Sequence, residues 1–254
     1  MKVVILAGGF GTRLSEYTEK IPKPMVNIGG IPMIEHIMNH FSRYGFKKFI
    51  ICLGYKQEII KDYFLNYNMR NSDIRVDLKS GDCSLLKARK KDWEVNLIQT
   101  GLLTKTGGRV KKIKHLISEK NFFLTYGDGL SNINLFKLLE FHEIKNKSIT
   151  ISAFKPQARF GELEITNGNV DSFQEKPQLK QGRINGGFFV VEKRFLDYID
   201  NDNEMLELEP IKRAIKEKEV SAYETDSFWR CVDSKRDLDY MRNLWEEGNA
   251  PWIT

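Results

Sequence analysis

The sequence predicts an α/β protein of three layers, with a mainly parallel mixed sheet covered by helices on both faces and a smaller β-rich portion. Two observations support this. Short, continuously apolar strand patterns alternate with helical patterns in the first half of the chain, which is typical of parallel sheets buried on both faces. The second half is dominated by strand patterns. The length of 254 residues suits one domain over 1–254.

In the first half, apolar runs predict strands and amphipathic patterns predict helices. The run VVILA begins at Val3 and meets glycine directly after Ala7. In PMIEHIMNHFSRYG, apolar residues recur at helical spacing, and Gly45 is a plausible helix stop. The predicted strands are 3–7, 47–55 and 121–129, and the predicted helices are 32–45, 56–64 and 135–145.

The second half contains strand patterns and two further helices. Asn167 and Gly168 stand between alternating runs, which is a hairpin signal. The predicted strands are 148–155, 162–173, 186–193 and 221–225, and the predicted helices are 209–220 and 237–248. Residues 79–100 are polar and basic with weak periodicity, so we interpret them as an insertion or a mobile flap.

Composition narrows the class of protein. No apolar stretch approaches the roughly 20 residues of a membrane span, so we expect a cytoplasmic protein without a membrane partner. The three cysteines are an odd number at wide spacings, which indicates neither a disulfide framework nor a zinc site. The net charge of +6 comes with basic clusters at 87–93 and 109–115. We interpret these clusters as solvated faces and expect no nucleic-acid partner.

The glycine-rich loop LAGGFGTRL follows the first predicted strand. It lacks the lysine of a P-loop, and Leu14 stands where a dinucleotide fingerprint needs its third glycine. What remains is a turn whose backbone N–H groups can approach a ligand, followed by Arg13, whose planar charged donors suit a triphosphate.

A lysine held between two prolines follows this loop. Pro22 and Pro24 restrict the backbone around Lys23 and so hold it on a stiff, extended segment. A lysine that must meet a phosphate benefits from such a holder, whereas a surface lysine does not need one.

The joint pattern of GGFGTRL followed by PKPM resembles the signature of the sugar-phosphate nucleotidyltransferases, also called pyrophosphorylases. Within that family the chain is most similar to the cytidylyltransferases, on account of TGGR, the PKP loop and the NAPW tail. The resemblance continues through CLGY (52–55), TGGR (106–109), TYGDG (125–129), FGELEI (160–165), FQEKP (173–177), INGGFFV (184–190) and LWEEGNAPW (244–252).

The resemblance implies a Rossmann-like nucleotidyltransferase fold, with a nucleotide-binding half over 1–145 and an acceptor-binding half over 146–254. It also implies a reaction in which CTP and a sugar phosphate, with glucose 1-phosphate as the expected acceptor, give a CDP-sugar and pyrophosphate. Such a transfer depends on positioning and charge neutralisation more than on covalent catalysis. A homo-oligomer is expected, with Trp245 and Trp252 as candidate interface residues.

The resemblance also assigns site residues. Arg13, Lys23 and Lys176 are the expected catalytic residues. Asp128 and Asp233 are the expected ligands of Mg²⁺, an ion that accepts one or two carboxylates together with phosphate oxygens. The expected nucleotide-binding residues are Leu6, Ala7, Gly8, Gly9, Gly11, Thr12, Arg13, Lys23, Thr104, Arg109, Gly127 and Asp128. The expected acceptor-binding residues are Glu162, Lys176, Asn185, Gly186, Glu209 and Arg230.

Alternatives remain open at this point. The chain departs from the family pattern in the acceptor half, where LELEP replaces WEQEP, FWRCVDS replaces FWQPMDT and FGEL replaces FGAL. The acceptor could therefore be another sugar phosphate, such as a ketose 6-phosphate or an alditol phosphate. A retaining glycosyltransferase is disfavoured because no second aspartate lies two residues after Asp128. A nucleotide-binding regulatory paralogue without catalysis is disfavoured because Arg13, Lys23, Asp128 and Asp233 are all present.

Overall fold

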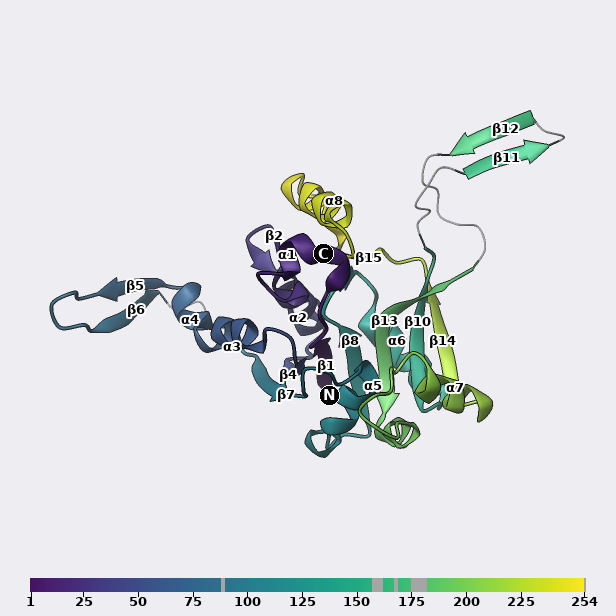
Figure 1. The fold of residues 1–254 in the computed structure, drawn as a ribbon, viewed down its shortest axis with the longest axis horizontal. Coiled ribbons are helices and arrows are strands. Elements are labelled where there is room, and N and C mark those ends of the chain that lie inside the picture. Colours follow the sequence, from purple (N-terminus) through teal and green to yellow (C-terminus); the bar gives the residue numbers. More distant parts are fainter. Residues whose placement is uncertain (88–89, 157–161, 167–168, 175–181, 254) are drawn as a thin grey trace.

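The structure is a computed structural model that describes residues 1–87, 90–156, 162–166, 169–174 and 182–253. For Arg13, Ser15 and the strands within 162–174 it describes the backbone. The chain forms a central sheet with helices packed on it, and two hairpins lie apart from the sheet at opposite ends of the view in Figure 1.

The central sheet has seven strands in the order β14-β10-β13-β8-β1-β4-β7. Both halves of the chain contribute: β1 (Lys2–Ala7), β4 (Lys48–Leu53), β7 (Glu94–Gln99) and β8 (Asn121–Tyr126) come from the first, and β10 (Ile149–Phe154), β13 (Ile184–Glu192) and β14 (Val220–Thr225) from the second. Strand β13 is antiparallel to both neighbours, and the other pairs are parallel. The predicted mainly parallel mixed sheet is therefore confirmed.

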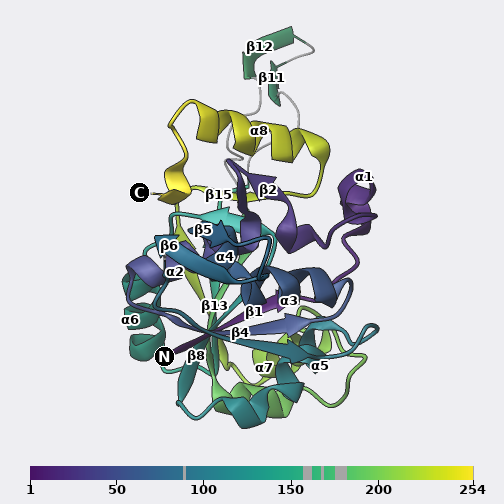
Figure 2. The same ribbon diagram turned by 90° about the vertical axis from the view of Figure 1, so that its left-hand side faces the viewer.

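Helices cover both faces of this sheet, as Figures 1 and 2 show. Buried residues of α2 (Met33–Arg43), α6 (Leu135–Lys145) and α8 (Lys235–Glu246) belong to one hydrophobic cluster. Those of α5 (Thr106–Lys112) and α7 (Glu209–Lys216) belong to the other. Helix α7 ends four residues before the predicted boundary, because the chain turns at Lys218, which has φ +59°, and enters β14 at Val220.

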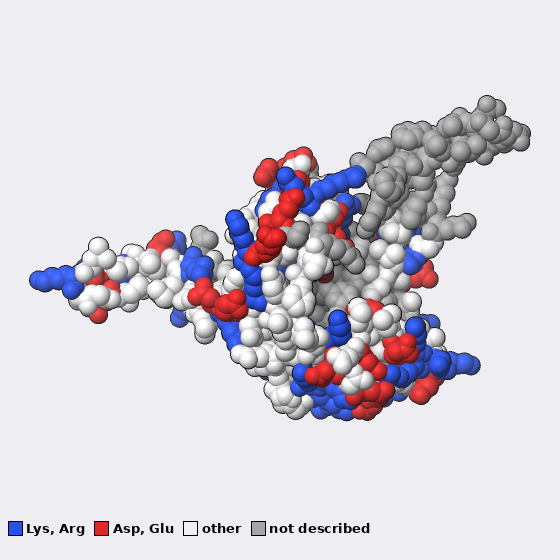
Figure 3. Space-filling model, viewed as in Figure 1, with Lys and Arg blue, Asp and Glu red and all other residues white. Residues whose placement is uncertain are grey.

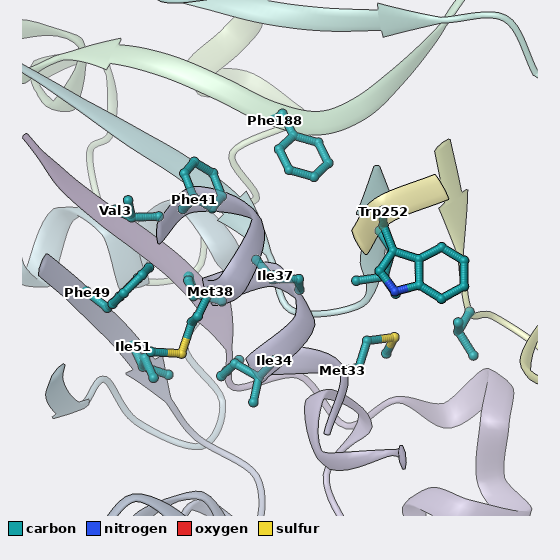
Figure 4. Close-up of a cluster of buried hydrophobic side chains, with 14 of the residues drawn as sticks. Val3, Met33, Ile34, Ile37, Met38, Phe41, Phe49, Ile51, Phe188 and Trp252 are labelled. Carbon is teal, nitrogen blue, oxygen red and sulfur yellow. The ribbon is translucent and has the colours of Figure 1, made fainter. Parts of the chain in front are cut away.

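The alternation of side chains along β1 divides the core into these two clusters. Val3, Ile5 and Ala7 join the cluster under α2, whereas Val4 and Leu6 join the cluster under α5. All five side chains are buried. A strand buried on both faces needs an uninterrupted apolar run, which explains the VVILA pattern. Figure 4 shows the first cluster, with the apolar side chains of α2 between β1 and the C-terminal Trp252.

A segment inserted after β4 projects from the body of the protein (Figure 1). It consists of α3 (Gln57–Leu65), α4 (Tyr67–Arg70) and the hairpin of β5 (Asp73–Val76) and β6 (Cys83–Lys87). The buried Glu35 carboxylate of α2 accepts hydrogen bonds from the hydroxyls of Tyr63 and Tyr67 and so ties the base of this segment to the core. We refer to residues 57–87 as the projecting arm.

The interpretation of residues 79–100 as an insertion or flap is wrong for their last part. Residues 83–87 do form half of the hairpin, but β7 pairs in parallel with β4 at the edge of the central sheet. An edge strand is covered on few sides, so β7 carries polar residues and shows little apolar periodicity. The hairpin around Asn167 and Gly168 is present as β11 (Glu162–Thr166) against β12 (Asn169–Gln174), while the two turn residues lie outside the described part.

The C-terminal segment packs onto its own chain. The short 3₁₀ helix η5 (Pro251–Ile253) follows α8, and Trp252 is 1% exposed. The indole N–H of Trp252 donates to Nδ1 of His36, and Nε2 of His36 lies 2.9 Å from the Ile28 carbonyl oxygen. Trp252 is therefore a core residue, which overturns its proposed place at a subunit interface. Within the described residues, no helix is long and apolar enough to cross a membrane.

Candidate active site

A cavity of about 690 Å³ opens where β1 and β8 end. Parallel sheets bind ligands at the carboxyl ends of their strands, and this volume suits a nucleotide-sized ligand. Its lining comes from both halves of the chain. The sequence-predicted residues that line it are Leu6, Ala7, Gly8, Gly9, Gly11, Thr12, Lys23, Thr104, Arg109, Gly127, Asp128, Asn185, Gly186 and Asp233.

The glycine loop after β1 forms one wall of the cavity. Gly11 has φ +67°, a left-handed conformation that favours glycine. A Cβ there would lie 2.8 Å from Cγ2 of Thr18, so the position also lacks space for a side chain. The Thr18 hydroxyl donates to the Gly11 carbonyl at 3.1 Å and fixes the turn. The 3₁₀ helix η1 (Thr12–Leu14) begins directly after it and includes the backbone of Arg13.

Lys23 reaches the cavity from the short 3₁₀ helix η2 (Lys23–Met25). Its Nζ donates to Oδ2 of Asp128 at 2.7 Å and to Oδ1 of Asp233 at 2.6 Å. Burial lowers the pKa of the Lys23 ammonium, but the Asp128 charge and the hydrogen bonds to both carboxylates outweigh this and hold the pKa above its usual value. The lysine is therefore charged throughout the neutral range.

The same place offers donors for a divalent ion. Oxygens of Asp128 and Asp233 and the Sγ of Cys231 lie within 4.8 Å of one another. The two carboxylates come from segments far apart in the sequence. Asp128 lies between β8 and β9 (Gly129–Ser131), and Asp233 follows β15 (Trp229–Cys231). Strand β15 pairs antiparallel with β9, which brings the two aspartates together. Two carboxylates that face one cavity fit Mg²⁺, and the Lys23 ammonium between them shows that the position attracts a cation.

Arg109 lies under the glycine loop and is 4% exposed. Its Nη1 donates to the Leu53 carbonyl at 2.9 Å and to the Thr100 hydroxyl at 2.7 Å, and its Nη2 donates to the carbonyls of Gly8 at 3.0 Å and Leu102 at 3.3 Å. A Cβ on Gly8 would lie 2.2 Å from Arg109 Nη1, so the loop needs glycine there. Arg109 thus joins the glycine loop to the 100–104 loop.

The opposite wall contains a hydrogen-bonded carboxylate at Glu207. Its Oε1 accepts from the Tyr126 hydroxyl, and its Oε2 accepts from the Thr106 hydroxyl at 2.8 Å. Burial and the Glu207 charge raise the pKa of Tyr126 above its usual value, so its hydroxyl remains a donor. The Trp229 indole N–H donates to the Gly186 carbonyl at 2.6 Å and closes this wall.

Two of the predicted acceptor-binding residues lie away from the cavity. Glu209 is at the start of α7, where its carboxylate pairs with Lys212 at 3.0 Å. Arg230 pairs with Asp237 of α8 at 2.8 Å and lies over the Tyr240 ring at 4.9 Å. Lys176 and the side chains of Arg13 and Glu162 lie outside the described part of the chain.

Sequence reasoning missed Glu207, Tyr126, Thr106, Trp229 and Cys231 as cavity residues. The sequence did point to a glutamate in LELEP, because the family motif WEQEP has glutamates at both positions. It could not show whether Glu207 or Glu209 faces the cavity. Which one faces the cavity depends on the loop before α7. Leu206 is buried and its N–H donates to the Thr106 hydroxyl at 2.8 Å, which places the next residue, Glu207, at the cavity wall.

The comparisons with known proteins agree with this geometry. A family model described as nucleotidyl transferase matches residues 2–246. The glucose-1-phosphate cytidylyltransferase of Salmonella typhimurium is 45% identical, over 100% of this chain and 99% of the relative. A probable glucose-1-phosphate cytidylyltransferase of Bacillus subtilis is 40% identical, over 99% of each chain. The crystal structure of HddC from Yersinia pseudotuberculosis complexed with GMP-PN has a TM-score of 0.68 at 25% identity and covers 96% of this chain and 99% of its own.

Proposed function

Because the chain belongs to the nucleotidyl transferase family, we propose that it joins CTP and α-glucose 1-phosphate to give CDP-glucose and pyrophosphate. The observation that carries this proposal is the cavity itself, in which a glycine loop, a buried lysine and two carboxylates meet. The full-length identity to two cytidylyltransferases supports the choice of nucleotide and acceptor.

The cavity provides for two substrates on its two walls. We place the triphosphate against the glycine loop of the half 1–145, with backbone N–H groups of Gly8, Gly9 and Gly11 toward the phosphates. The sugar phosphate lies against the half 146–254, near Asn185 and Gly186. Both walls line one continuous cavity, so the two reactants can meet in line.

The reaction is a direct displacement at phosphorus. A phosphate oxygen of the sugar phosphate bonds to the α-phosphorus of CTP, and the bond from that phosphorus to the pyrophosphate oxygen breaks. Lys23 holds charge near the reacting phosphates, Arg13 stabilises the departing pyrophosphate, and Lys176 contacts the acceptor's phosphate. Asp128 and Asp233 would hold Mg²⁺, and the ion would supply neutralisation of phosphate charge.

Base recognition depends on the loop that Arg109 braces. Cytosine carries acceptors at O2 and N3, so a donor near the base favours cytosine over uracil. We assign the donor role to Thr104. The two Nη groups of Arg109 already donate to four protein oxygens, so Arg109 contributes indirectly: its bonds to the Gly8 and Leu102 carbonyls set the distance between the phosphate loop and the base-facing 100–104 loop.

The Glu207 carboxylate is placed to accept hydrogen bonds from hydroxyl groups of the sugar phosphate. Glu207 faces the cavity and is held by Tyr126 and Thr106, whereas Glu209 pairs with Lys212 outside it. We therefore propose that Glu207, together with Glu162 of β11, accepts hydrogen bonds from the hydroxyl groups of the sugar. A carboxylate fixed in this way distinguishes sugars by the position of their hydroxyl groups, because a misplaced hydroxyl group cannot donate to its remaining lone pairs.

The assembly state is proposed from the projecting arm. A two-stranded hairpin is only marginally stable alone, and apolar residues exposed together mark contact surfaces. We propose a homo-oligomer in which the arm packs on another copy of this chain. Its exposed apolar residues are Leu65, Met69, Ile74, Val76, Leu78, Leu85 and Leu86.

A cytoplasmic location agrees with the cysteines, which form no disulfide. Cys52, Cys83 and Cys231 are free, as expected in a reducing compartment.

On the face shown in Figure 3, basic and acidic residues intermix over the body of the protein rather than forming one basic patch. This pattern gives no support to a nucleic-acid surface.

A pyrophosphate-release assay with Mg²⁺ tests the proposed function, with each of the four nucleoside triphosphates crossed against a panel of sugar phosphates. We expect the largest kcat/KM for CTP with glucose 1-phosphate. Turnover with CTP only on a ketose 6-phosphate or an alditol phosphate would retain the nucleotide and overturn the acceptor. Absence of turnover with CTP and any acceptor would overturn the function.

A further inference from the structure

We propose that the Lys23 ammonium occupies the divalent-ion position between Asp128 and Asp233 while the nucleotide is absent, so that the metal ion binds tightly only when the nucleotide draws Lys23 away. The inference rests on the proposed function, since it concerns the metal site of that reaction. It makes Lys23 a gate on the metal site as well as a phosphate-binding residue.

The distances place the nitrogen where an ion would lie. Lys23 Nζ is 2.7 Å from Oδ2 of Asp128, 2.6 Å from Oδ1 of Asp233 and 3.9 Å from Sγ of Cys231. These three donors lie within 4.8 Å of one another. Mg²⁺ bonds oxygen at about 2.0–2.1 Å, so an ion that bonds both carboxylates must also lie between them. An ammonium and a divalent ion cannot share that space.

Charge reinforces this exclusion. Lys23 is 8% exposed, and its charge is balanced by two carboxylates at hydrogen-bond distance. With the lysine in place, an entering ion meets two negative groups and one positive group instead of two negative groups alone. Like charges a few ångströms apart repel strongly at a partly buried site, so the lysine weakens binding of a free metal ion.

The backbone lets the ammonium leave without rearrangement of the fold. Lys23 opens the 3₁₀ helix η2, with Pro22 extended before it and Pro24 after it, so its Cα is fixed. A Cβ on Gly11 would lie 3.2 Å from Cβ of Lys23, which puts the root of the side chain directly against the glycine loop. From this root, rotation of the four-carbon stem alone can move Nζ from the carboxylates toward phosphates bound at the loop.

The triphosphate supplies the exchange partner. When its oxygens arrive, Lys23 can trade the carboxylates for phosphate oxygens, and the freed carboxylates can accept the ion that arrives with the nucleotide. Each cation then has an anionic partner before and after the exchange, so no buried charge is left alone. Metal binding and the placement of the catalytic lysine are thereby coupled.

Binding of Mn²⁺, measured by electron paramagnetic resonance without any substrate, tests the proposal. We compare the wild type with Lys23→Met, which removes the ammonium and adds no metal ligand with affinity for Mn²⁺. The control is Lys105→Met, because Lys105 lines the same cavity and has an exposed side chain. Lys23→Met is expected to bind Mn²⁺ at least about tenfold more tightly than the wild type, and Lys105→Met within about twofold of it.

Two further samples locate the effect. Lys23→Met combined with Asp128→Asn is expected to lose the gain, and wild type with a non-hydrolysable CTP analogue is expected to bind Mn²⁺ at least about tenfold more tightly than wild type alone. Circular dichroism confirms that each variant is folded, and Lys23→Leu replaces Lys23→Met if that variant is not. The proposal is overturned if folded Lys23→Met binds Mn²⁺ no more tightly than the wild type. If the wild type is nevertheless active in the pyrophosphate-release assay, the proposed function stands although the role of Lys23 at the metal site is overturned.

Discussion

Replacing Arg109 by methionine tests whether this arginine braces the nucleotide side of the cavity. The substitution retains an apolar stem of similar length and removes the guanidinium. Arg109 is 4% exposed and bonds three carbonyls and one hydroxyl in segments far apart in the sequence. We expect lower stability together with weaker binding of the nucleotide.

The size of the stability loss follows from which acceptors keep a donor. The Leu53 carbonyl still accepts from Thr100 N at 3.0 Å and Oγ1 at 2.7 Å, and the Gly8 carbonyl still accepts from Tyr55 N at 3.2 Å. The net loss is therefore closer to two charged hydrogen bonds than four. At about 1.5–3 kcal/mol each, and with the guanidinium no longer desolvated, the free energy of unfolding should fall by about 2–4 kcal/mol. For a chain of this length, that lowers Tm by about 4–16 °C.

Differential scanning calorimetry measures the first effect, and steady-state kinetics the second. The KM for CTP should rise at least about fivefold while the KM for the sugar phosphate changes little, because the braced loops belong to the nucleotide wall. Arg236→Met is the matched control, since Arg236 is exposed on α8, and it should change neither quantity. An Arg109→Met variant with the Tm and CTP KM of the wild type would refute the reasoning.

The other predictions concern the carboxylates and the thiols. Asp128→Asn should lower kcat at least about a hundredfold with an unchanged circular dichroism spectrum, and near-normal turnover would contradict its metal role. Glu207→Gln should raise the KM for the sugar phosphate at least about tenfold while Glu209→Gln does not, and equal effects would contradict the assignment of Glu207. Burial and the Asp128 charge raise the pKa of the Cys231 thiol, so at pH 8 iodoacetamide should modify the exposed Cys83 first, as read by mass spectrometry. Faster modification of Cys231 would contradict that shift.

Much of the fold could be predicted because its strands are buried on both faces. The runs that became β1, β4 and β8 are continuously apolar, and the helix after Pro32 has a regular apolar period. Strand β7 escaped prediction because it lies at the edge of the sheet beside β4, and its side chains are exposed or half-buried. The polar residues of β7 are typical of an exposed segment, and its pairing with β4 is what makes it part of the sheet.

The nucleotide side of the site was more predictable than the acceptor side for a similar reason. Gly11 is required by its positive φ and Gly8 by the close approach of the Arg109 side chain, and each requirement appears in the sequence as a glycine. Glu207 and Glu209 differ only in which way a loop directs them, and that loop is set by the hydrogen bond from the Leu206 N–H to the hydroxyl of Thr106, which lies 100 positions earlier in the chain. Tertiary contacts of this kind leave no local pattern.

The pairing of Arg230 illustrates the same limit. Arg230 is close in sequence to the predicted metal ligand Asp233, so the sequence predicts that its guanidinium binds the sugar phosphate. In the structure its guanidinium bonds Asp237 and lies over the Tyr240 ring, so β15 directs it toward α8. Alternate residues of a strand face opposite sides, and Cys231 takes the cavity side instead.

The most direct test of the account is ³¹P NMR of one reaction mixture that contains the protein, Mg²⁺, CTP and α-glucose 1-phosphate. The account predicts that pyrophosphate and CDP-glucose appear in equal amounts as both substrates disappear. CTP that remains unchanged, or that is converted to CDP and inorganic phosphate without a CDP-sugar, would contradict nucleotidyl transfer to this acceptor.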